Sequence, residues 1–257
     1  MPTNRRRWTR DELLLALNVY CRTPFGKIHS RNAEIIALSK TMGRTPSAVA
    51  MKLLNFASLD PIHHARQVRG LSNAGKEDLH IWQEFNDNWE QLAFESQLAM
   101  LRVRRESSTA EGEYSEMPSL GVATDRESTV RVRLVQRFFR DAVLSSYDYT
   151  CAMCQLRLPQ MLTASHIIPW SKNIARRADP KNGLALCAFH DRAFDRGLVA
   201  LDDDRRILVS AKVRIRTTSR LHQVGFLDIE GTKALTPARF APAMDAITYH
   251  RKEIFLQ

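Results

Sequence analysis

Two cysteine-containing patterns constrain the fold of this chain more than any other feature of its sequence. Cys151 and Cys154 are separated by two residues, and the same spacing recurs between Cys187 and His190. Each pair has the spacing of two ligands to one zinc ion, so a Cys₃His set would join segments that are far apart in the sequence. Four cysteines in 257 residues do not suggest a disulfide scaffold, and such thiols fit a reducing cytoplasm.

The charge balance predicts a polyanionic partner, since the net charge is +10 and the isoelectric point about 9.8. Residues 106–127 oppose this trend with six acids and a single arginine, in a stretch rich in Ser, Thr, Glu and Gly. We interpret this stretch as a flexible acidic linker between two more basic segments. No apolar run is long enough to cross a membrane, and the first residues lack a signal-peptide pattern, so we expect no membrane association.

The segment before the linker is predicted to be helical. Thr9 and Glu12 form a capping-box pattern before apolar residues at helical spacing. A second helix over about 32–42 should end at Gly43, and a third should open at Thr45. A further helix is expected over about 76–105. Two helices joined by a short glycine turn are typical of a helix-turn-helix, and the first three helices look like a Myb- or SANT-like unit.

This N-terminal segment is also basic, with ten basic residues against three acids in residues 5–55. Such a balance suits DNA binding, and Arg44, Ser47 and Lys52 are the residues we expect to face DNA. A plain helical bundle that binds another protein is the alternative interpretation.

Beyond the linker, a helix is predicted over about 128–146, followed by a short-strand region over 150–168. A helix near 187–196, a hairpin made of 198–201 and 207–212, and a helical tail over 241–255 complete the expected elements. Three ordered blocks stand out in this region: Ser165–Trp170, Pro180–Leu184 and His190–Gly197.

The blocks place a His, an Asn and a second His in order, with gaps of 16 and 8 residues. The sequence between them permits two short strands followed by a helix, which is the ββα-metal layout. The blocks closely resemble those of the HNH endonuclease family, in a bacterial branch usually described as restriction endonucleases. The resemblance implies an HNH nuclease domain (128–257). Together with the helical, helix-turn-helix-like domain (1–105) and the acidic linker (106–127) predicted above, it gives an α+β fold class.

Phosphodiester hydrolysis explains why these residue types are needed. Water is a weak nucleophile at neutral pH, and a neutral imidazole beside the scissile phosphate can take its proton. We assign this general-base role to His166 and expect Asn182 to hold the loop that orients it. A divalent cation, Mg²⁺ or Mn²⁺, must stabilise the charge that develops on the phosphate and the leaving oxygen.

The ligands of this cation remain open. In the family they come from the helix of the motif and from the residue before the base, but that residue is Ser165 here, and a serine hydroxyl is a poor Mg²⁺ ligand. In one alignment His190 is the last His of the motif and binds the catalytic cation. In the other, Asp191 and Asp195, which share one helical face, are the ligands.

The cysteines bear on this choice. Many HNH nucleases carry a four-ligand zinc site around the same core, and the resemblance places Cys151, Cys154, Cys187 and His190 at those positions. If His190 binds structural zinc, then Asp191 and Asp195 hold the catalytic cation. In the predicted helix before the core, Arg133, Gln136 and Arg140 are candidates for DNA contact, since a similar Gln-x-x-Phe-Arg pattern occurs in the resembling branch.

The expected function is therefore a metal-dependent endonuclease for double-stranded DNA, in restriction or phage defence, located in the cytoplasm. A homodimer would supply two active sites for a double-strand break. The alternative is a non-catalytic zinc-containing DNA-binding protein, which Ser165 favours because it weakens the metal site. RNA as the substrate is a third hypothesis.

Overall fold

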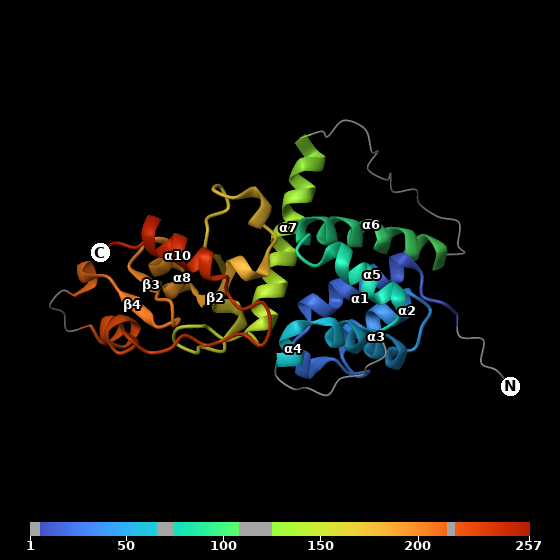
Figure 1. Ribbon diagram of the computed structural model, residues 1–257, viewed down its shortest axis with the longest axis horizontal. Helices are drawn as coiled ribbons and strands as arrows, with labels where there is room; N and C mark the ends of the chain where they lie inside the picture. Colours follow the sequence, from blue (N-terminus) through green and yellow to red (C-terminus); the bar gives the residue numbers. More distant parts are fainter. Residues whose placement is uncertain (1–5, 66–73, 108–124, 215–218) are drawn as a thin grey trace. The chain divides into compact units, whose positions relative to one another are not determined.

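The structure is a computed structural model that describes residues 6–65, 74–107, 125–214 and 219–257. The chain forms two compact units that divide along the sequence between Gln136 and Arg137 (Figure 1). The division falls inside helix α7 (Asp125–Ser146), whereas the sequence placed the domain boundaries at 105 and 127. Most of the predicted acidic linker lies outside the described residues, so its flexibility stays a prediction.

Unit 1 is helical throughout its described part. Its helices are α1 (Arg10–Arg22), α2 (Ala33–Thr41), α3 (Pro46–Leu59), α4 (Pro61–Ala65), α5 (Lys76–Phe85), α6 (Trp89–Ser107) and the start of α7, with a 3₁₀ turn at Phe25–Lys27. The capping box of Thr9 and Glu12 is confirmed at α1, and Thr45 caps α3 as expected. Gly43 ends the turn after α2 with a φ of 60°, a conformation that glycine adopts without strain.

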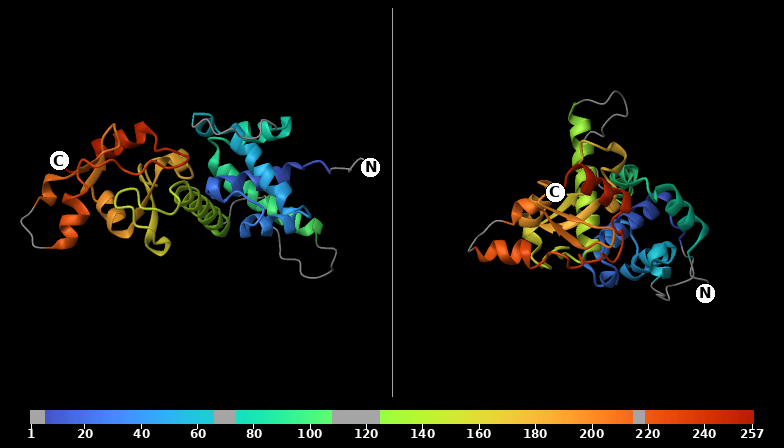
Figure 2. Two further views of the ribbon diagram at one scale, coloured as in Figure 1. Left: turned by 90° about the horizontal axis from the view of Figure 1, so that it is seen from below. Right: turned by 60° about the vertical axis from the view of Figure 1, so that its left-hand side comes forward.

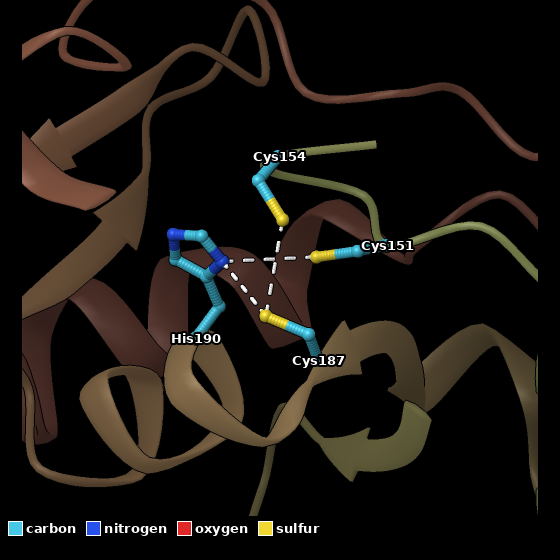
Figure 3. Close-up of side chains that lie close together, drawn as sticks. All are labelled: Cys151, Cys154, Cys187 and His190. Carbon is cyan, nitrogen blue, oxygen red and sulfur yellow. Dashed lines mark hydrogen bonds between the residues drawn. The ribbon is translucent and has the colours of Figure 1, made fainter. Parts of the chain in front are cut away.

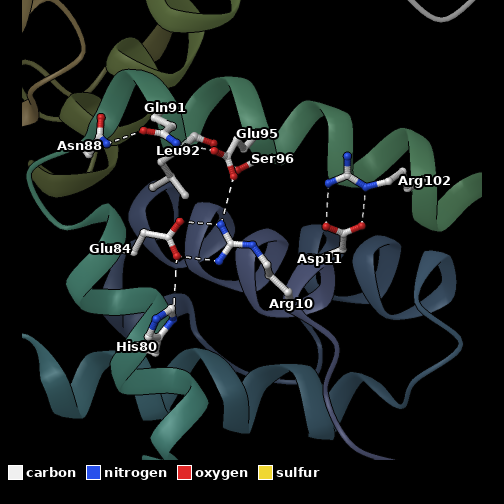
Figure 4. Close-up of polar contacts among 10 residues, drawn as sticks. All are labelled: Arg10, Asp11, His80, Glu84, Asn88, Gln91, Leu92, Glu95, Ser96 and Arg102. Atoms are coloured by element: carbon white, nitrogen blue, oxygen red, sulfur yellow. Dashed lines mark hydrogen bonds and ion pairs between the residues drawn. The ribbon is translucent and has the colours of Figure 1, made fainter. Parts of the chain in front are cut away.

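Helix α1 is the centre of unit 1 and contacts α3, α5 and α6 (Figure 2). Nine of its thirteen residues are buried, which explains why its apolar positions extend beyond a single stripe. Arg10 donates two hydrogen bonds of 2.6 Å to Glu84 of α5, and Arg102 of α6 pairs with Asp11 (Figure 4). The expected single helix over 76–105 is wrong, because it breaks between α5 and α6, where Asp87 has a φ of 77°.

Unit 2 is a mixed α and β unit. Its elements are the end of α7, β1 (Leu162–His166), β2 (Gly183–Cys187), α8 (Ala188–Asp195), β3 (Val199–Leu201), β4 (Ile207–Val209), α9 (Arg220–His222), a π-helical turn (Gln223–Leu227) and α10 (Met244–Glu253). Short 3₁₀ turns lie at Pro159–Met161, Ile174–Arg176, Pro180–Asn182 and Ala211–Val213. No helix among the described residues of either unit is long and apolar enough to span a membrane.

Two antiparallel strand pairs organise this unit. Strand β1 pairs with β2 so that Leu162 faces Cys187 and His166 faces Gly183. Helix α8 follows β2 directly and contacts both strands, which gives the predicted ββα order. Strands β3 and β4 form the predicted hairpin in shortened form.

A close approach of α7 to β2 fixes the position of this sheet. A Cβ atom on Gly183 would lie 2.4 Å from Val143 Cγ2 and 2.9 Å from Phe139 Cζ. Only glycine allows these two α7 side chains to pack directly on the strand. The sequence placed Gly183 inside the Pro180–Leu184 block but gave no indication of this packing role.

Candidate metal centre and catalytic cleft

The four residues of the Cys₃His pattern converge in unit 2, as Figure 3 shows. Their ligand atoms all lie within 4.8 Å of one another. Cys154 Sγ is 3.8 Å from Cys187 Sγ, and His190 Nδ1 is 3.8 Å from Cys151 Sγ and 3.2 Å from Cys187 Sγ. Cys154 is exposed and the other three are buried. This arrangement could hold a metal ion.

Local backbone structure brings the two halves of the cluster together. Cys151 and Cys154 lie on a tight turn in which the Gln155 amide donates to Cys151 O and Gln155 has a φ of 60°. Cys187 ends β2, and its place opposite Leu162 sets it near the segment that precedes β1. His190 follows in the first turn of α8. The cluster therefore depends on the strand register as well as on the spacing of its residues.

Both ring nitrogens of His190 are occupied by contacts on this side of α8. Nε2 lies 3.0 Å from the carbonyl oxygen of Gly225, to which it can only donate, so Nδ1 is the nitrogen that faces the sulfurs and that would bind a metal after losing its proton. Burial lowers the pKa of His190, but the contacts with Cys151 and Cys187 outweigh it and raise the pKa to about 10. Hydrogen bonds with Cys154 and Cys187 lower the pKa of Cys151. The contacts with Cys151 and Cys187 in turn raise the pKa of Cys154. Metal binding would therefore require this cluster to release protons.

A cleft of about 430 Å³ opens beside β1 and α8. It is lined by Thr163, Ala164, Ser165, His166, Pro169, Trp170, Asp191, Asp195, His250 and Ile254. The structure therefore brings the predicted base and the two predicted carboxylates to one cavity, and His190 is not among its lining residues.

His166 is held in a defined orientation at the end of β1. Its ring stacks on Phe139 with centroids 3.8 Å apart, and Trp170 packs edge-on against it. Nε2 lies 3.0 Å from Arg177 O and can only donate to it, which leaves the lone pair on Nδ1. Burial lowers the pKa of His166, and the hydrogen bond to Arg177 offsets this only in part. The ring is thus neutral at neutral pH.

Asn182 joins the two ends of the loop that holds His166. Its Oδ1 accepts a hydrogen bond of 2.8 Å from Ile168 N, and its Nδ2 donates to Ile168 O at 3.0 Å and to Arg176 O at 3.3 Å. The side chain is buried, with 1% of the residue exposed. Arg176 precedes the residue whose carbonyl fixes the His166 ring, so Asn182 acts on His166 through the backbone.

The two aspartates of α8 form no salt bridge that the structure describes, although Arg192 and Arg196 are neighbours in the sequence. Burial raises the pKa of Asp191, which is half-buried. Burial and the charge of Asp191 both raise the pKa of Asp195. The Ser165 hydroxyl is buried near Asp191 but has no hydrogen-bond partner of normal geometry among the described residues. The charge of Arg192 lowers the pKa of both aspartates and that of Arg196 lowers the pKa of Asp195, so these arginines offset part of the negative charge at this end of the cleft.

One cleft residue was not predicted from the sequence at all. His250 comes from α10, far along the chain, and its ring stacks on Phe194 at 3.6 Å between centroids. The sequence indicated only a helical tail there, and a single histidine in an amphipathic pattern gives no signal for a site.

Two of the three unit 1 residues predicted to face DNA, Arg44 and Lys52, are instead paired with buried carboxylates. Arg44 pairs with the buried Glu12 at 2.8 Å and lies 4.0 Å from the centre of the Trp8 ring. Lys52 pairs with the buried Asp78 at 2.7 Å. The two cationic side chains are only 10% and 12% exposed, so they are occupied inside unit 1. Ser47 is exposed in the first turn of α3.

The three candidates on α7 are exposed and share one helical face, since they are three and four residues apart. Arg133 and Gln136 belong to unit 1, and Arg140 belongs to unit 2. Arg140 also donates a hydrogen bond of 2.9 Å to Leu162 O, at the start of β1. Its guanidinium is therefore partly committed to the sheet.

Two strands and a helix that carry a cysteine–histidine cluster on one side and a histidine–carboxylate cleft on the other define a ββα-metal type of domain. Residues 151–202 match the family model described as HNH endonuclease, and this segment of the chain belongs to that family. The domain implies a nucleic acid as the substrate class. None of the curated proteins compared with the chain matches it.

Proposed function

We propose that this protein is a metal-dependent DNA endonuclease in which His166 is the general base. The observation that supports it best is the state of His166. Its Nε2 is committed to Arg177 O, its pKa is lowered, and it lines the same cleft as Asp191 and Asp195. A neutral imidazole with its lone pair on Nδ1 is the form that can take a proton from water.

The chain's own residues can perform the positioning steps of hydrolysis. Asn182 fixes the 168–176 loop through hydrogen bonds to its backbone. The carbonyl of Arg177, which follows this loop, accepts a hydrogen bond from Nε2 of His166 and so fixes its tautomer. Nδ1 of His166 then receives the proton of the attacking water. The bond between phosphorus and the 3′ oxygen breaks as the new bond to the water oxygen forms, and the 3′ oxygen takes a proton from solvent while His166 returns its proton to solvent. The ends therefore carry a 5′ phosphate and a 3′ hydroxyl. Asp191 and Asp195 would hold Mg²⁺ or Mn²⁺, which supplies electrostatic stabilisation of the charge that develops on the phosphate.

We assign His190 to a structural zinc site and not to the catalytic cation. With Zn–S bonds of about 2.3 Å and Zn–N bonds of about 2.0 Å, tetrahedral zinc spaces its ligand atoms by about 3.5–3.8 Å. Three of the six separations between ligand atoms are 3.2–3.8 Å, near that spacing, and all six lie within 4.8 Å. The donation from Nε2 to Gly225 O is the kind of contact that orients a zinc-binding histidine.

The wider role is proposed from the same resemblance. We infer a function in restriction or phage defence in the cytoplasm, with unit 1 as a helix-turn-helix-like recognition domain. Because Arg44 and Lys52 are paired inside unit 1, the proposed DNA contacts rest on Ser47 and on Arg133, Gln136 and Arg140. A homodimer would allow cleavage of both strands.

The test is cleavage of supercoiled plasmid, with and without base modification, in Mg²⁺ or Mn²⁺. We expect nicked and linear products with wild type and none with His166→Ala, while His80→Ala, which alters an exposed histidine of unit 1, cleaves as wild type does. A parallel assay with RNA tests the other substrate.

The alternative is a zinc-containing protein that binds DNA without cutting it. It is favoured by Ser165, which stands where the family has a metal ligand. Wild-type protein that binds every DNA substrate and leaves it intact with either metal would establish this alternative.

A further inference from the structure

Helix α10 brings a histidine to the cleft from outside the segment that matches the HNH family. His250 lines the cavity together with His166, Asp191 and Asp195. The family match ends at residue 202, so the match assigns no role to this side chain. A second imidazole beside two carboxylates needs an explanation of its own.

The hydrogen bonding of His250 leaves one nitrogen unused. Nε2 donates to Phe194 O at 3.0 Å, which places the lone pair on Nδ1. The residue is 2% exposed, and Nδ1 has no hydrogen-bond partner among the described residues. A buried acceptor without a donor is unfavourable, and most such atoms in folded proteins are satisfied by protein, water or a ligand.

The contact with Phe194 O does not by itself explain the histidine. That carbonyl also accepts a hydrogen bond of 2.9 Å from Gly197 N, so the end of α8 remains satisfied without His250. Stacking on Phe194 needs a flat ring but no nitrogen. The atom that neither role uses is Nδ1.

Other polar groups of the cleft also lack part of their hydrogen bonding or charge compensation. Ser165 Oγ is buried near Asp191 without a hydrogen bond of normal geometry among the described residues, and the charges of Arg192 and Arg196 only partly offset those of Asp191 and Asp195, whose pKa values remain raised. Among the described residues, only the cysteine–histidine cluster gathers three or more ligating side chains closely enough to hold an ion directly. A cation in the cleft would therefore take at most two ligands from His, Cys, Asp or Glu side chains of the described residues in this arrangement.

An ion held in this way keeps much of its water. Mg²⁺ is commonly bound by one or two carboxylates and retains several waters, whose hydrogens need acceptors. The cleft, at about 430 Å³, has room for such a hydrated ion. His250 lines this cleft, and its buried, unpartnered Nδ1 is a suitable acceptor for such a water.

We propose that His250 is a positioning residue for the cation of the cleft, with Nδ1 accepting a hydrogen bond from the ion's hydration water. The proposal rests on the proposed function only in assuming that the cleft binds a divalent cation. His250 contacts neither the reacting phosphate nor the proton that His166 takes.

Two substitutions of His250 test the roles of its two ring nitrogens separately. His250→Asn retains a polar atom near the position of Nδ1 but not of Nε2, and His250→Gln does the reverse. Mn²⁺ binding to the zinc-loaded full-length protein is measured by electron paramagnetic resonance, with thermal unfolding as a check of folding. We expect His250→Gln to weaken Mn²⁺ binding about tenfold, as loss of an indirect contact to a metal commonly does. His250→Asn should weaken it less, and the exposed control Lys252→Ala should match wild type.

The outcomes separate this role from a structural one and from the proposed function. Equal Mn²⁺ affinity in His250→Gln and wild type would overturn the role of His250, as would a larger loss in His250→Asn than in His250→Gln. If Asp191→Asn abolishes Mn²⁺ binding while His250→Gln does not alter it, only the His250 role fails. If the wild type binds no Mn²⁺ and cuts no DNA, both proposals fail.

Discussion

The cysteine–histidine cluster and the cleft share helix α8 but differ in how completely their ligands converge. The cluster gathers four ligand atoms within 4.8 Å and buries three of its residues. The cleft offers two carboxylates without a third ligating side chain close by among the described residues. Closed four-ligand sites hold a fold together, whereas open sites leave positions for water and substrate. If both sites bind metal as proposed, residues of one helix contribute to a closed site that retains its ion and to an open site that can exchange it.

The largest expected effect separates the chemistry of the cleft from the metal of the cluster. His166→Ala should lower the cleavage rate by about a hundredfold to ten-thousandfold, the range for loss of a general base. Zinc content, measured by atomic absorption, should stay at that of wild type because no ligand of the cluster is changed. Loss of zinc together with activity would show that the two sites are not separable.

The reverse experiment removes a ligand of the cluster. Cys151→Ser should abolish bound zinc and lower the melting temperature, because metal binding and folding are coupled in small zinc sites. Cys21→Ser changes the buried cysteine of unit 1 and is the matched control, with zinc content expected to match wild type. An unchanged melting temperature in zinc-free Cys151→Ser would mean that the cluster does not stabilise unit 2.

Substitution of Asn182 tests whether its hydrogen bonds to the loop keep His166 correctly oriented in the cleft. Asn182→Ala leaves the amide of Ile168 and the carbonyls of Ile168 and Arg176 without their partner, at a cost of about 1–3 kcal/mol for each buried group left unpaired. Urea unfolding should show this loss, and cleavage should fall even at temperatures where the variant is folded. Full activity in a destabilised variant would separate the loop from the orientation of His166.

The decline of the cleavage rate at low pH tests the proposed role of His166 as general base. Its folded-state pKa lies below the ordinary value of 6.5, so the neutral form persists as pH falls through 6.5 and is lost only at lower pH. Single-turnover cleavage at saturating Mg²⁺ should therefore decline only below pH 6.5. A decline centred well above 6.5 would contradict a buried neutral base.

The smallest effect concerns α7. Arg133→Ala should weaken DNA binding and lower the slope of log affinity against log salt by about 1, the change for one lost phosphate contact. Arg137→Ala, at a side chain 80% exposed, is the comparison within the same helix. Fluorescence anisotropy at several salt concentrations measures both, and equal slopes for wild type and Arg133→Ala would exclude the contact.

Local patterns predicted the parts of the molecule that depend on neighbours in sequence. The caps of α1 and α3 and the order of β1, β2 and α8 followed from short motifs, because capping and strand pairing across one loop involve nearby residues. The choice left open for His190 could not be made from spacing. It depends on Gly225 O, which lies 35 residues away in a π-helical turn.

Long-range pairing is what sequence inspection missed. Arg44 and Lys52 had the composition of a DNA-facing surface, but buried Glu12 and Asp78 attract them inward, because a buried carboxylate needs a partner. The same holds for His250, whose place in the cleft is set by packing of α10 on Phe194. The local motifs that contain Glu12 and Phe194 gave no indication of these long-range contacts.

The position of both sites on α8 has a practical consequence for handling this protein. His190 lies in the first turn of the helix and Asp195 at its end, so an ion in the cluster fixes the segment that carries the carboxylates. A chelator would then inactivate the protein in two stages. The first is fast and is reversed by adding Mg²⁺. The second is slow, and activity returns only after zinc has been restored. The history of a preparation, and the order in which metals are returned to it, would set its measured activity.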